Sequence, residues 1–151
     1  MINLNIDFKW QPVLENESKQ YFFPNEISHY MRQKYRIPAI YRWIVENNGR
    51  TESIYIGEAK DLCPQRVYGY LNPGPSQMTN IRINNLFNQL TKEGKNIRLE
   101  HLVFSDFIFN DRKMTPQDLN RKTIRILLEN IMLTYHENDK ITILNQAINS
   151  K

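Results

Sequence analysis

Three tyrosines, one arginine and one glutamate are the side chains of this sequence best suited to chemistry on a phosphodiester. In chain order they are Tyr41, Tyr55, Arg66, Tyr70 and Glu129. Hydrolysis of such a bond needs an activated water, neutralisation of the phosphate charge and help for the leaving oxygen. A guanidinium can hold a phosphate through its planar fork, a carboxylate can hold Mg²⁺ together with waters, and phenol hydroxyls can orient water. The set predicts phosphate-ester hydrolysis if the fold brings these residues together.

A β-hairpin is expected to position the first two tyrosines. The pair Asn48-Gly49 separates two short apolar runs, and both residues tolerate the positive φ that hairpin turns require. A register that sets Tyr41 opposite Gly57 puts Tyr41 and Tyr55 on one face, because side chains alternate with period two. Gly57 then leaves a space opposite the Tyr41 ring, where the backbone of another molecule can come close.

A short helix after the hairpin is expected to add the arginine and the third tyrosine. Asp61 can cap this helix, and Arg66 and Tyr70 are four residues apart on one side of it. Each tyrosine taken alone is explained as well by a core position with a satisfied hydroxyl. The argument for chemistry depends on the whole set.

Glu129 lies inside a helix that is predicted to begin at Thr115 and to run to about His136. Thr115 is a cap, a proline follows it, and Asp118 stands three residues later. The helical neighbours of Glu129 are apolar, and an unpaired buried charge costs on the order of several kcal/mol. Two partners are open on spacing alone: Arg125 one turn earlier, which is the more ordinary explanation, or a metal cation.

The ordered set resembles the GIY-YIG nuclease superfamily. Ala39-Ile40-Tyr41 stands where the family has Gly-Ile-Tyr, and Tyr55-Ile56-Gly57 is the second tripeptide. Arg66 follows eleven positions after Tyr55, and Glu129 lies on a later helix. The likeness covers roughly residues 38–146. Ala39 in place of the first glycine is a departure from the family pattern.

The resemblance implies a metal-dependent endonuclease. The resemblance implies that Glu129 is the ligand of Mg²⁺ (or Mn²⁺), and it thereby reverses the preference for an ion pair with Arg125. It also implies that Tyr41 takes the proton of the attacking water. Asn145 matches an asparagine that braces the family's site, with Asn138 as the second candidate. Tyr70 stands where several relatives have histidine.

A second departure from the family pattern lies directly after the second tripeptide. Some relatives have lysine there and this chain has Glu58, so either Lys60 replaces that charge or Glu58 turns outward.

A net charge of +4 favours an anionic partner. The suggested nucleic-acid contacts are Gly57, Lys60, Asn80, Arg82, Arg32 and Lys34. Asn80 and Arg82 lie near the start of a helix capped by Thr79, where phosphates bind readily, or else on a solvated face. Arg32 and Lys34 end another helix, where cations also serve a purely structural purpose.

The predicted fold class is α+β: a small antiparallel sheet of about three strands, flanked by helices, with an N-terminal extension over residues 1–37 and a catalytic core over residues 38–146 of one domain. The extension reads as a strand over residues 2–10 and a helix over residues 24–35. Residues 97–104 form the third core strand, and residues 105–115 are a polar loop.

Composition bears on the cellular compartment that we expect for this protein. No apolar run approaches the roughly 20 residues of a membrane span. Cys63 is the only cysteine, so an internal disulfide is excluded and a reducing cytoplasm is expected.

The combined prediction is an endonuclease that cleaves DNA, in duplex form, in a restriction or defence role, with a homodimer as one arrangement that could read two strands. Two alternatives stay open at this point. One is a nucleic-acid-binding module that no longer cleaves, and the other is a toxin-type nuclease acting on RNA.

Overall fold

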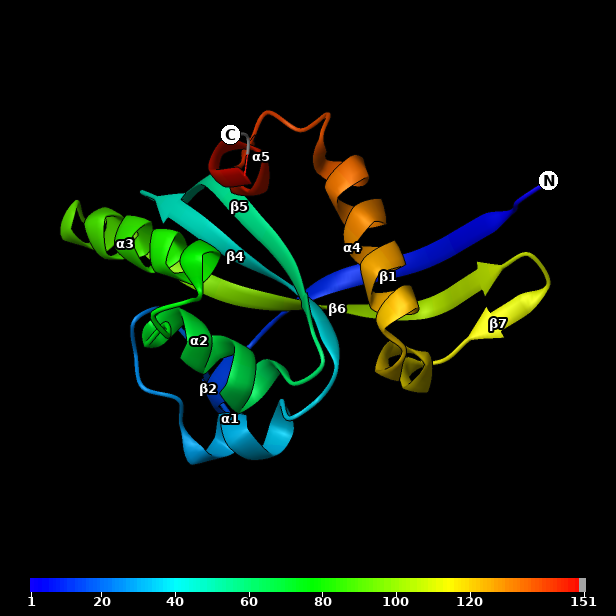
Figure 1. The fold of residues 1–151 in the computed structure, drawn as a ribbon, viewed down its shortest axis with the longest axis horizontal. Coiled ribbons are helices and arrows are strands. Elements are labelled where there is room, and N and C mark those ends of the chain that lie inside the picture. The colour runs from blue at the N-terminus through cyan, green and yellow to red at the C-terminus, as the bar shows by residue number, and fades with distance from the viewer. Residues whose placement is uncertain (150–151) are drawn as a thin grey trace.

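The structure is a computed structural model that describes residues 1–149, and it has an α+β fold built on one six-stranded mixed sheet (Figure 1). The strand order is β1-β6-β4-β5-β8, with β7 beside β6, and only β5 and β8 run parallel. The strands are β1 (Leu4–Pro12), β4 (Ala39–Asn47), β5 (Arg50–Ala59), β6 (Asn96–Phe109), β7 (Arg112–Met114) and β8 (Thr142–Ile143). A separate two-stranded sheet is formed by β2 (Leu14–Asn16) and β3 (Lys19–Gln20).

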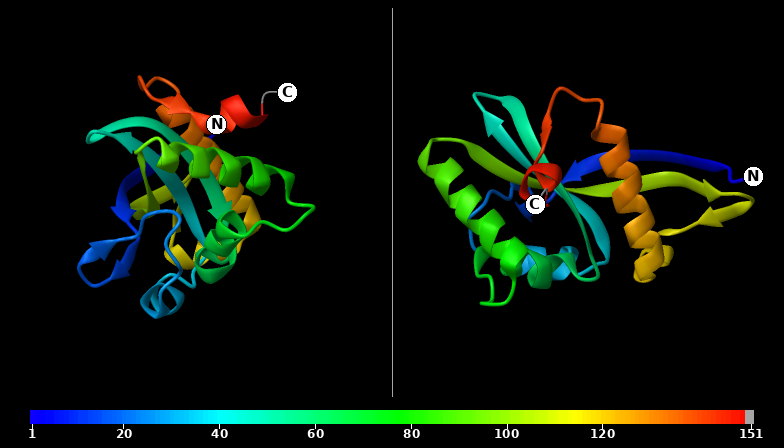
Figure 2. Two further views of the ribbon diagram at one scale, coloured as in Figure 1. Left: turned by 90° about the vertical axis from the view of Figure 1, so that its left-hand side faces the viewer. Right: turned by 45° about the horizontal axis from the view of Figure 1, so that its top comes forward.

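Helices cover both faces of the sheet, and each face has its own apolar core. The first core lies under α1 (His29–Lys34), α2 (Val67–Leu71) and α3 (Met78–Lys92), and the second lies under α4 (Lys122–His136). In Figures 1 and 2, α2 and α3 lie on one side of β5 and α4 lies on the other. The remaining helical segments are η1 (Leu62–Arg66), η2 (Pro116–Asn120) and α5 (Leu144–Asn149).

The hairpin of β4 and β5 has the predicted register. Tyr41 pairs with Gly57 and Trp43 pairs with Tyr55, so Tyr41 and Tyr55 share the face of the first core. The turn uses Asn48 and Gly49 at φ values of 53° and 79°. Both residues tolerate this conformation, which is why the Asn-Gly pair predicts the turn correctly.

The prediction of a sheet of about three strands is wrong. β6, β4 and β5 do form an antiparallel centre, but β1 extends it along β6 and β8 extends it along β5. The apolar side of β1 explains its place, since Ile6, Phe8 and Trp10 pack against the second core. The segment expected as an extension is therefore built into the sheet.

The N-terminal helix is shorter than the predicted span of residues 24–35. It begins at His29, because Ser28 is the cap and its hydroxyl accepts a hydrogen bond from the Met31 amide at 3.1 Å. Similarly, α3 begins at Met78 with Gln77 as its cap, so Thr79 lies inside the helix and does not cap it. Gly94 follows the end of α3 with a φ of 86°, a conformation that glycine adopts readily.

The predicted loop over residues 105–115 is also wrong, because β6 continues to Phe109 and turns back into β7. A bulge at Ser105 lets the strand bend while Phe107 still reaches the second core. The helix start at Thr115 has both bonds of a capping box, but they close only the short helix η2. Arg121 is extended (φ −87°, ψ 123°), so α4 begins anew at Lys122 and ends at His136.

Candidate active site

Three tyrosine rings meet on the face of the first core, and their hydroxyls form its polar end. The Tyr41 and Tyr70 hydroxyls are 2.5 Å apart, and the Tyr55 and Tyr70 rings lie edge to face with centroids 6.3 Å apart. Tyr41 comes from β4, Tyr55 from β5 and Tyr70 from α2. Tyr41 is 1% exposed, Tyr70 is 2% exposed and Tyr55 is 7% exposed. Tyr55 is therefore the phenol with the most solvent contact.

Gly57 is where the tyrosine cluster approaches the backbone most closely. A Cβ built on Gly57 would collide with the Tyr41 ring, including its hydroxyl. The space predicted opposite Tyr41 is thus filled by the Tyr41 ring itself and is not open to another molecule. Glycine is required here because any side chain would push the Tyr41 hydroxyl away from Tyr70.

Arg66 supplies the positive charge of this cluster. It ends η1 directly before α2 and faces the three phenols, and its charge lowers the pKa of Tyr41, Tyr55 and Tyr70. Burial acts in the opposite direction and is stronger, so the pKa of each phenol stays above its usual value of about 10. The phenols are neutral hydrogen-bonding groups until a further cation approaches.

The turn before α2 differs in one detail from the sequence prediction. Asp61 stands at the cap position of η1, but its side chain makes no capping hydrogen bond. The helix start is held by the backbone, since the Leu62 amide donates to Ile37 and the Cys63 amide donates to Tyr35, both at 2.9 Å. The Cys63 thiol is buried and burial raises its pKa to about 12, so it is a structural residue.

The outer edge of β5 brings Glu129 to the cluster. Backbone groups on this edge point outward at every second residue. Ile54 pairs with β8, and Ile56 exchanges two hydrogen bonds with the Asn145 side chain, at 2.9 and 2.6 Å. The next outward amide, that of Glu58, lies near the Glu129 carboxylate and lowers its pKa, against the larger effects of burial and the Glu58 carboxylate. The side chains of Asn145 and Glu129 therefore lie along the outer edge of β5, next to the second tripeptide.

Asn145 is the asparagine whose side chain contacts the second tripeptide. It holds the backbone of Ile56, which lies between Tyr55 and Gly57. β8 ends at Ile143, and Asn145 lies in the first turn of α5. Asn138 lies in the exposed turn after α4.

Glu129 does not pair with Arg125, so the ion pair that spacing favoured is wrong. The Arg125 Nε atom bonds instead to Glu58 Oε1 at 2.7 Å, and Nη1 donates to the carbonyl groups of Leu119 and Asn120. Arg125 thereby ties the end of η2 to β5. It also draws Glu58 to α4, which settles how this chain accommodates a glutamate after the second tripeptide.

The charge on Glu129 is left only partly compensated. Burial and the nearby Glu58 carboxylate raise the Glu129 pKa, and Arg66 acts against both. A half-buried carboxylate close to one guanidinium, the phenols of Tyr41 and Tyr55 and a second carboxylate is a suitable place for a cation.

A polar pocket of about 340 Å³ adjoins this cluster between α2, α3 and the start of α4. Its charged lining consists of four cations and two carboxylates: Lys60, Arg66, Lys122, Arg125, Glu58 and Asp61. Gly69 and Asn80 also line it, and the Asn80 amide packs against Gly69. The pocket has the dimensions and charge to receive a phosphate group beside Arg66.

The pocket gathers some of the predicted nucleic-acid contacts and excludes others. Lys60 and Asn80 line it with Arg66. Arg32 lines a different hollow between α1 and α2, and the Lys34 ammonium donates to the Tyr30 hydroxyl at 3.0 Å. Arg82 lies on an exposed part of α3.

Lys122 is the pocket residue that the sequence argument missed. It lies seven residues before Glu129, which is two turns of one helix, and Arg125 lies between them. The spacing places all three on one side of the helix, and the predicted helix already contained them, so this signal was present in the sequence.

The residues suit a lightly anchored divalent cation. No cluster of three or more histidine, cysteine, aspartate or glutamate side chains occurs among residues 1–149, so an all-protein metal cage is not part of this site. Mg²⁺ commonly binds through one or two carboxylates and otherwise keeps water and phosphate oxygens. Glu129, whose charge interacts with the pocket residues Glu58 and Arg66, is the carboxylate that would supply such a ligand.

His136 belongs to a different constellation on the opposite face of the sheet. Its Nε2 accepts a hydrogen bond from Trp10 Nε1 at 3.3 Å, and its Nδ1 lies 2.7 Å from Asp139. In this geometry Nε2 is the hydrogen-bond acceptor and Nδ1 faces the Asp139 carboxylate. His136 is buried although it ends α4.

Comparison with protein-family models, curated proteins and solved structures finds no match for this chain. None of the helices within residues 1–149 is both long and apolar enough to span a membrane. The interpretation of the site therefore rests on its own residues and their geometry.

Proposed function

We propose that this chain is a metal-dependent endonuclease of the GIY-YIG type that hydrolyses phosphodiester bonds in duplex DNA. One observation carries the proposal: Tyr41, Tyr55, Tyr70, Arg66 and Glu129 come from four distant segments and meet at the end of one hairpin. Structural packing explains one buried tyrosine, but it does not explain an arginine and a glutamate gathered around three phenols.

Arg66 and the neighbouring pocket would bind the scissile phosphate. The guanidinium can form two parallel hydrogen bonds to phosphate oxygens, and this pairing is strong where water is scarce. Lys60 and Lys122 add positive charge on two sides of the same pocket. Their positions suit the phosphates on either side of the one that is cut.

Tyr41 would act as a base in its deprotonated form: its phenol proton first leaves to solvent, and the phenolate Oη then takes the proton of the attacking water and becomes a neutral hydroxyl again. Burial raises the Tyr41 pKa and opposes this role, whereas Arg66 and the hydrogen bond with Tyr70 favour it, and a nearby cation would add to their effect. Tyr55 is the most solvent-exposed phenol and would orient the water before transfer. Asn145 keeps this strand in place, since it holds the Ile56 backbone from the open edge.

Glu129 would hold the divalent cation, Mg²⁺ or Mn²⁺, at the rim of the pocket. A bound cation supplies charge neutralisation at the phosphate and lowers the pKa of groups beside it. The fit rests on a carboxylate whose nearest charged neighbours leave room for further positive charge.

The direct test combines a substrate panel with one matched pair of variants. The protein is incubated with supercoiled plasmid, linear duplex, single-stranded DNA and RNA, in Mg²⁺, Mn²⁺ or EDTA, and the cut ends are mapped. Glu129→Gln should bind duplex DNA and leave it intact, whereas Glu137→Gln, at the exposed end of the same helix, should cut normally. Cleavage in EDTA, or by Glu129→Gln, would refute the proposed metal site.

A second function is favoured by the deep burial of Tyr41 and Tyr70. A hydroxyl that is almost inaccessible suits a structural hydrogen bond, and the chain would then be a binding module that holds nucleic acid without cutting it. Binding to duplex DNA with no cleavage of any substrate in Mg²⁺ or Mn²⁺ would favour this alternative. Cleavage of RNA alone would indicate a toxin-type nuclease.

The biological setting follows by analogy with the family. Compact members without a separate recognition domain act in restriction or defence, and we propose the same setting for this chain. Plasmid or phage DNA cut at defined sequences would support that setting, and cutting without sequence preference would count against it.

A further inference from the structure

The outer edge of β1 is an open β-strand edge. β1 pairs only with β6, and three bonds show which of its backbone groups face that partner. The Val13 amide donates to Leu99, the Asn3 carbonyl accepts from Asn110, and the Asp7 carbonyl accepts from the Ser105 hydroxyl. Odd-numbered residues therefore face β6. The backbone groups of the even-numbered residues from Leu4 to Trp10 point outward, and within residues 1–149 they have no strand beside them.

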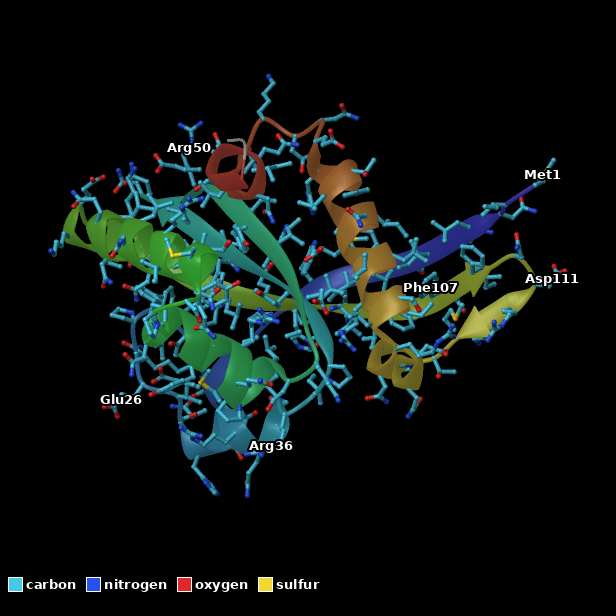
Figure 3. The ribbon with its side chains drawn as sticks, in the orientation of Figure 1. Met1, Glu26, Arg36, Arg50, Phe107 and Asp111 are labelled. Atoms are coloured by element: carbon cyan, nitrogen blue, oxygen red, sulfur yellow. The ribbon has the colours of Figure 1, made fainter. Side chains whose placement is uncertain are left out.

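Apart from the exposed charges of Asp7 and Lys9, this edge lacks the features that usually keep strand edges apart. Native edges are protected by prolines, bulges or inward-pointing charges. Here the first proline is Pro12, at the end of the strand, and the bulge lies in β6. The inward side chains Ile6, Phe8 and Trp10 are all apolar. β1 also runs out along an arm that ends near Met1 and the turn at Asp111, away from α2 and α3 (Figures 1 and 3).

Two charged side chains on the other side of β1 lack ion-pair partners. Asp7 and Lys9 are both exposed, and neither has an ion pair in the part of the chain that the structure describes. Across the strand pair Asp7 faces Asp106, which is a like charge. A positive group on the open side of Asp7 would relieve this repulsion.

We propose that β1 pairs antiparallel with β1 of a second copy of this chain, with Phe8 opposite Phe8 at the two-fold axis. In this register Asp7 of each copy lies opposite Lys9 of the other, so two opposite-charge pairs form. Moving the centre by one residue places Asp7 opposite Asp7 or Lys9 opposite Lys9. The charges therefore select one register among those that the outward-facing backbone groups permit.

The apolar face of β1 would also contribute to this contact between the two copies. Tyr135 on α4 packs edge to face on Phe8 with ring centroids 5.2 Å apart, yet it is 59% exposed. Its free surface adjoins the open edge, where a second Phe8 would arrive. The pairing would join the two sheets into one, bury the two Phe8 side chains together and satisfy the outward backbone groups from both copies.

Charge reversal tests this register directly through the oligomeric state, measured by sedimentation velocity or light scattering across a concentration series. Asp7→Lys and Lys9→Asp should each weaken the dimer by roughly tenfold or more, since two attractive pairs become repulsive in each variant. The double variant Asp7→Lys/Lys9→Asp should dimerise again. An equimolar mixture of the two single variants should form heterodimers, because every cross-strand pair is then of opposite charge.

The control is Asp111→Lys, which makes the same charge change at the tip of the arm and should dimerise like the wild type. Circular dichroism checks that each variant is folded. A wild-type protein that stays monomeric at high micromolar concentration would overturn the proposal and leave the edge to an extended segment of another protein. Single variants that dimerise normally, or a mixture that does not associate, would overturn the register. None of these outcomes depends on whether the protein cleaves DNA.

Discussion

The two faces of the central strands differ in how completely their charged side chains are paired with opposite charges. On the face of α4, Arg42 and Arg98 both bind Glu100, with distances of 2.7 and 2.5 Å, and Arg98 also binds Glu46 at 3.1 Å. Trp10 covers the Arg42 guanidinium at 4.6 Å. Every charge in this network has an opposite charge beside it.

On the other face the charges are fewer and less balanced. Tyr41 is the neighbour of Arg42 in the chain, but its hydroxyl faces Tyr70 and Arg66. The Glu129 carboxylate, which belongs to α4 and lies near the edge of β5, has a raised pKa because burial and Glu58 outweigh Arg66. Stability alone would favour the paired arrangement, since an incompletely paired buried charge is costly. The contrast supports our proposal that the Tyr41 face and the adjoining β5 edge form the site and that the Arg42 network is structural.

The largest expected effect is the loss of cleavage in Glu129→Gln. The substitution removes the negative charge and keeps the size of the side chain, so the fold should stay intact. Single-turnover cleavage of duplex DNA should fall below detection, and the melting temperature should change little. A large fall in melting temperature with cleavage preserved would assign Glu129 to the paired, structural class.

Tyr41→Phe should reduce single-turnover cleavage by about 10²–10⁴-fold, the usual contribution of a general base. Tyr55→Phe should cost less, because Tyr55 only orients water in the proposed mechanism. Thermal unfolding of both variants separates catalysis from packing, since the ring that fills the core is kept. Cleavage by Tyr41→Phe at nearly the wild-type rate would exclude Tyr41 as the base.

The matched change on the opposite face is Glu100→Gln. Glu100 is 7% exposed and neutralises two arginines, so its loss leaves buried positive charge and should lower the free energy of unfolding by about 3 kcal/mol. Denaturant unfolding measures this value. The cleavage rate of the folded variant should match the wild type at low temperature, and a rate loss without destabilisation would contradict the division between the two faces.

The smallest effect concerns pH and His101, which pairs with Tyr41 across β4 and β6. Burial lowers the His101 pKa from 6.5 to about 4. Protonation therefore favours the unfolded chain, and the contribution of neutral His101 to stability is complete above about pH 6.5 and is lost as the pH falls towards 4. The loss is about 3 kcal/mol at most, since one pKa unit is about 1.4 kcal/mol. Unfolding curves of His101→Gln should vary less with pH over this range, and equal pH dependence in both proteins would refute the assignment.

Local rules account for the parts of the fold that sequence predicts correctly. The turn at Asn48-Gly49 and the pairing of Tyr41 with Gly57 follow from backbone φ preferences and period-two alternation. The end of α3 at Gly94 has the same kind of cause. These features depend on residues close in the chain, so they are visible before any tertiary contact is known.

The sequence predictions are wrong where contacts between distant segments determine the secondary structure. The capping box at Thr115 is real, but packing breaks the chain at Arg121 and starts α4 afterwards. Residues 105–115 look polar and loop-like, yet the bulge at Ser105 keeps β6 beside β1. In the end of β6 and in β7, the pairing between strands outweighs the local preference of these residues for a loop.

For the candidate site, the sequence by itself determined the residue types, their order and the shared face of Tyr41 and Tyr55. Only the tertiary structure decided the partners of the charges. Arg125 is four residues from Glu129 in the chain but binds Glu58 from β5, and the Glu129 carboxylate lies near the Glu58 backbone at the strand edge. Side chains one helical turn apart can meet, but a stronger partner on another element takes precedence when the fold buries them together. Long-range geometry, which no local spacing encodes, left Glu129 without an arginine of its own.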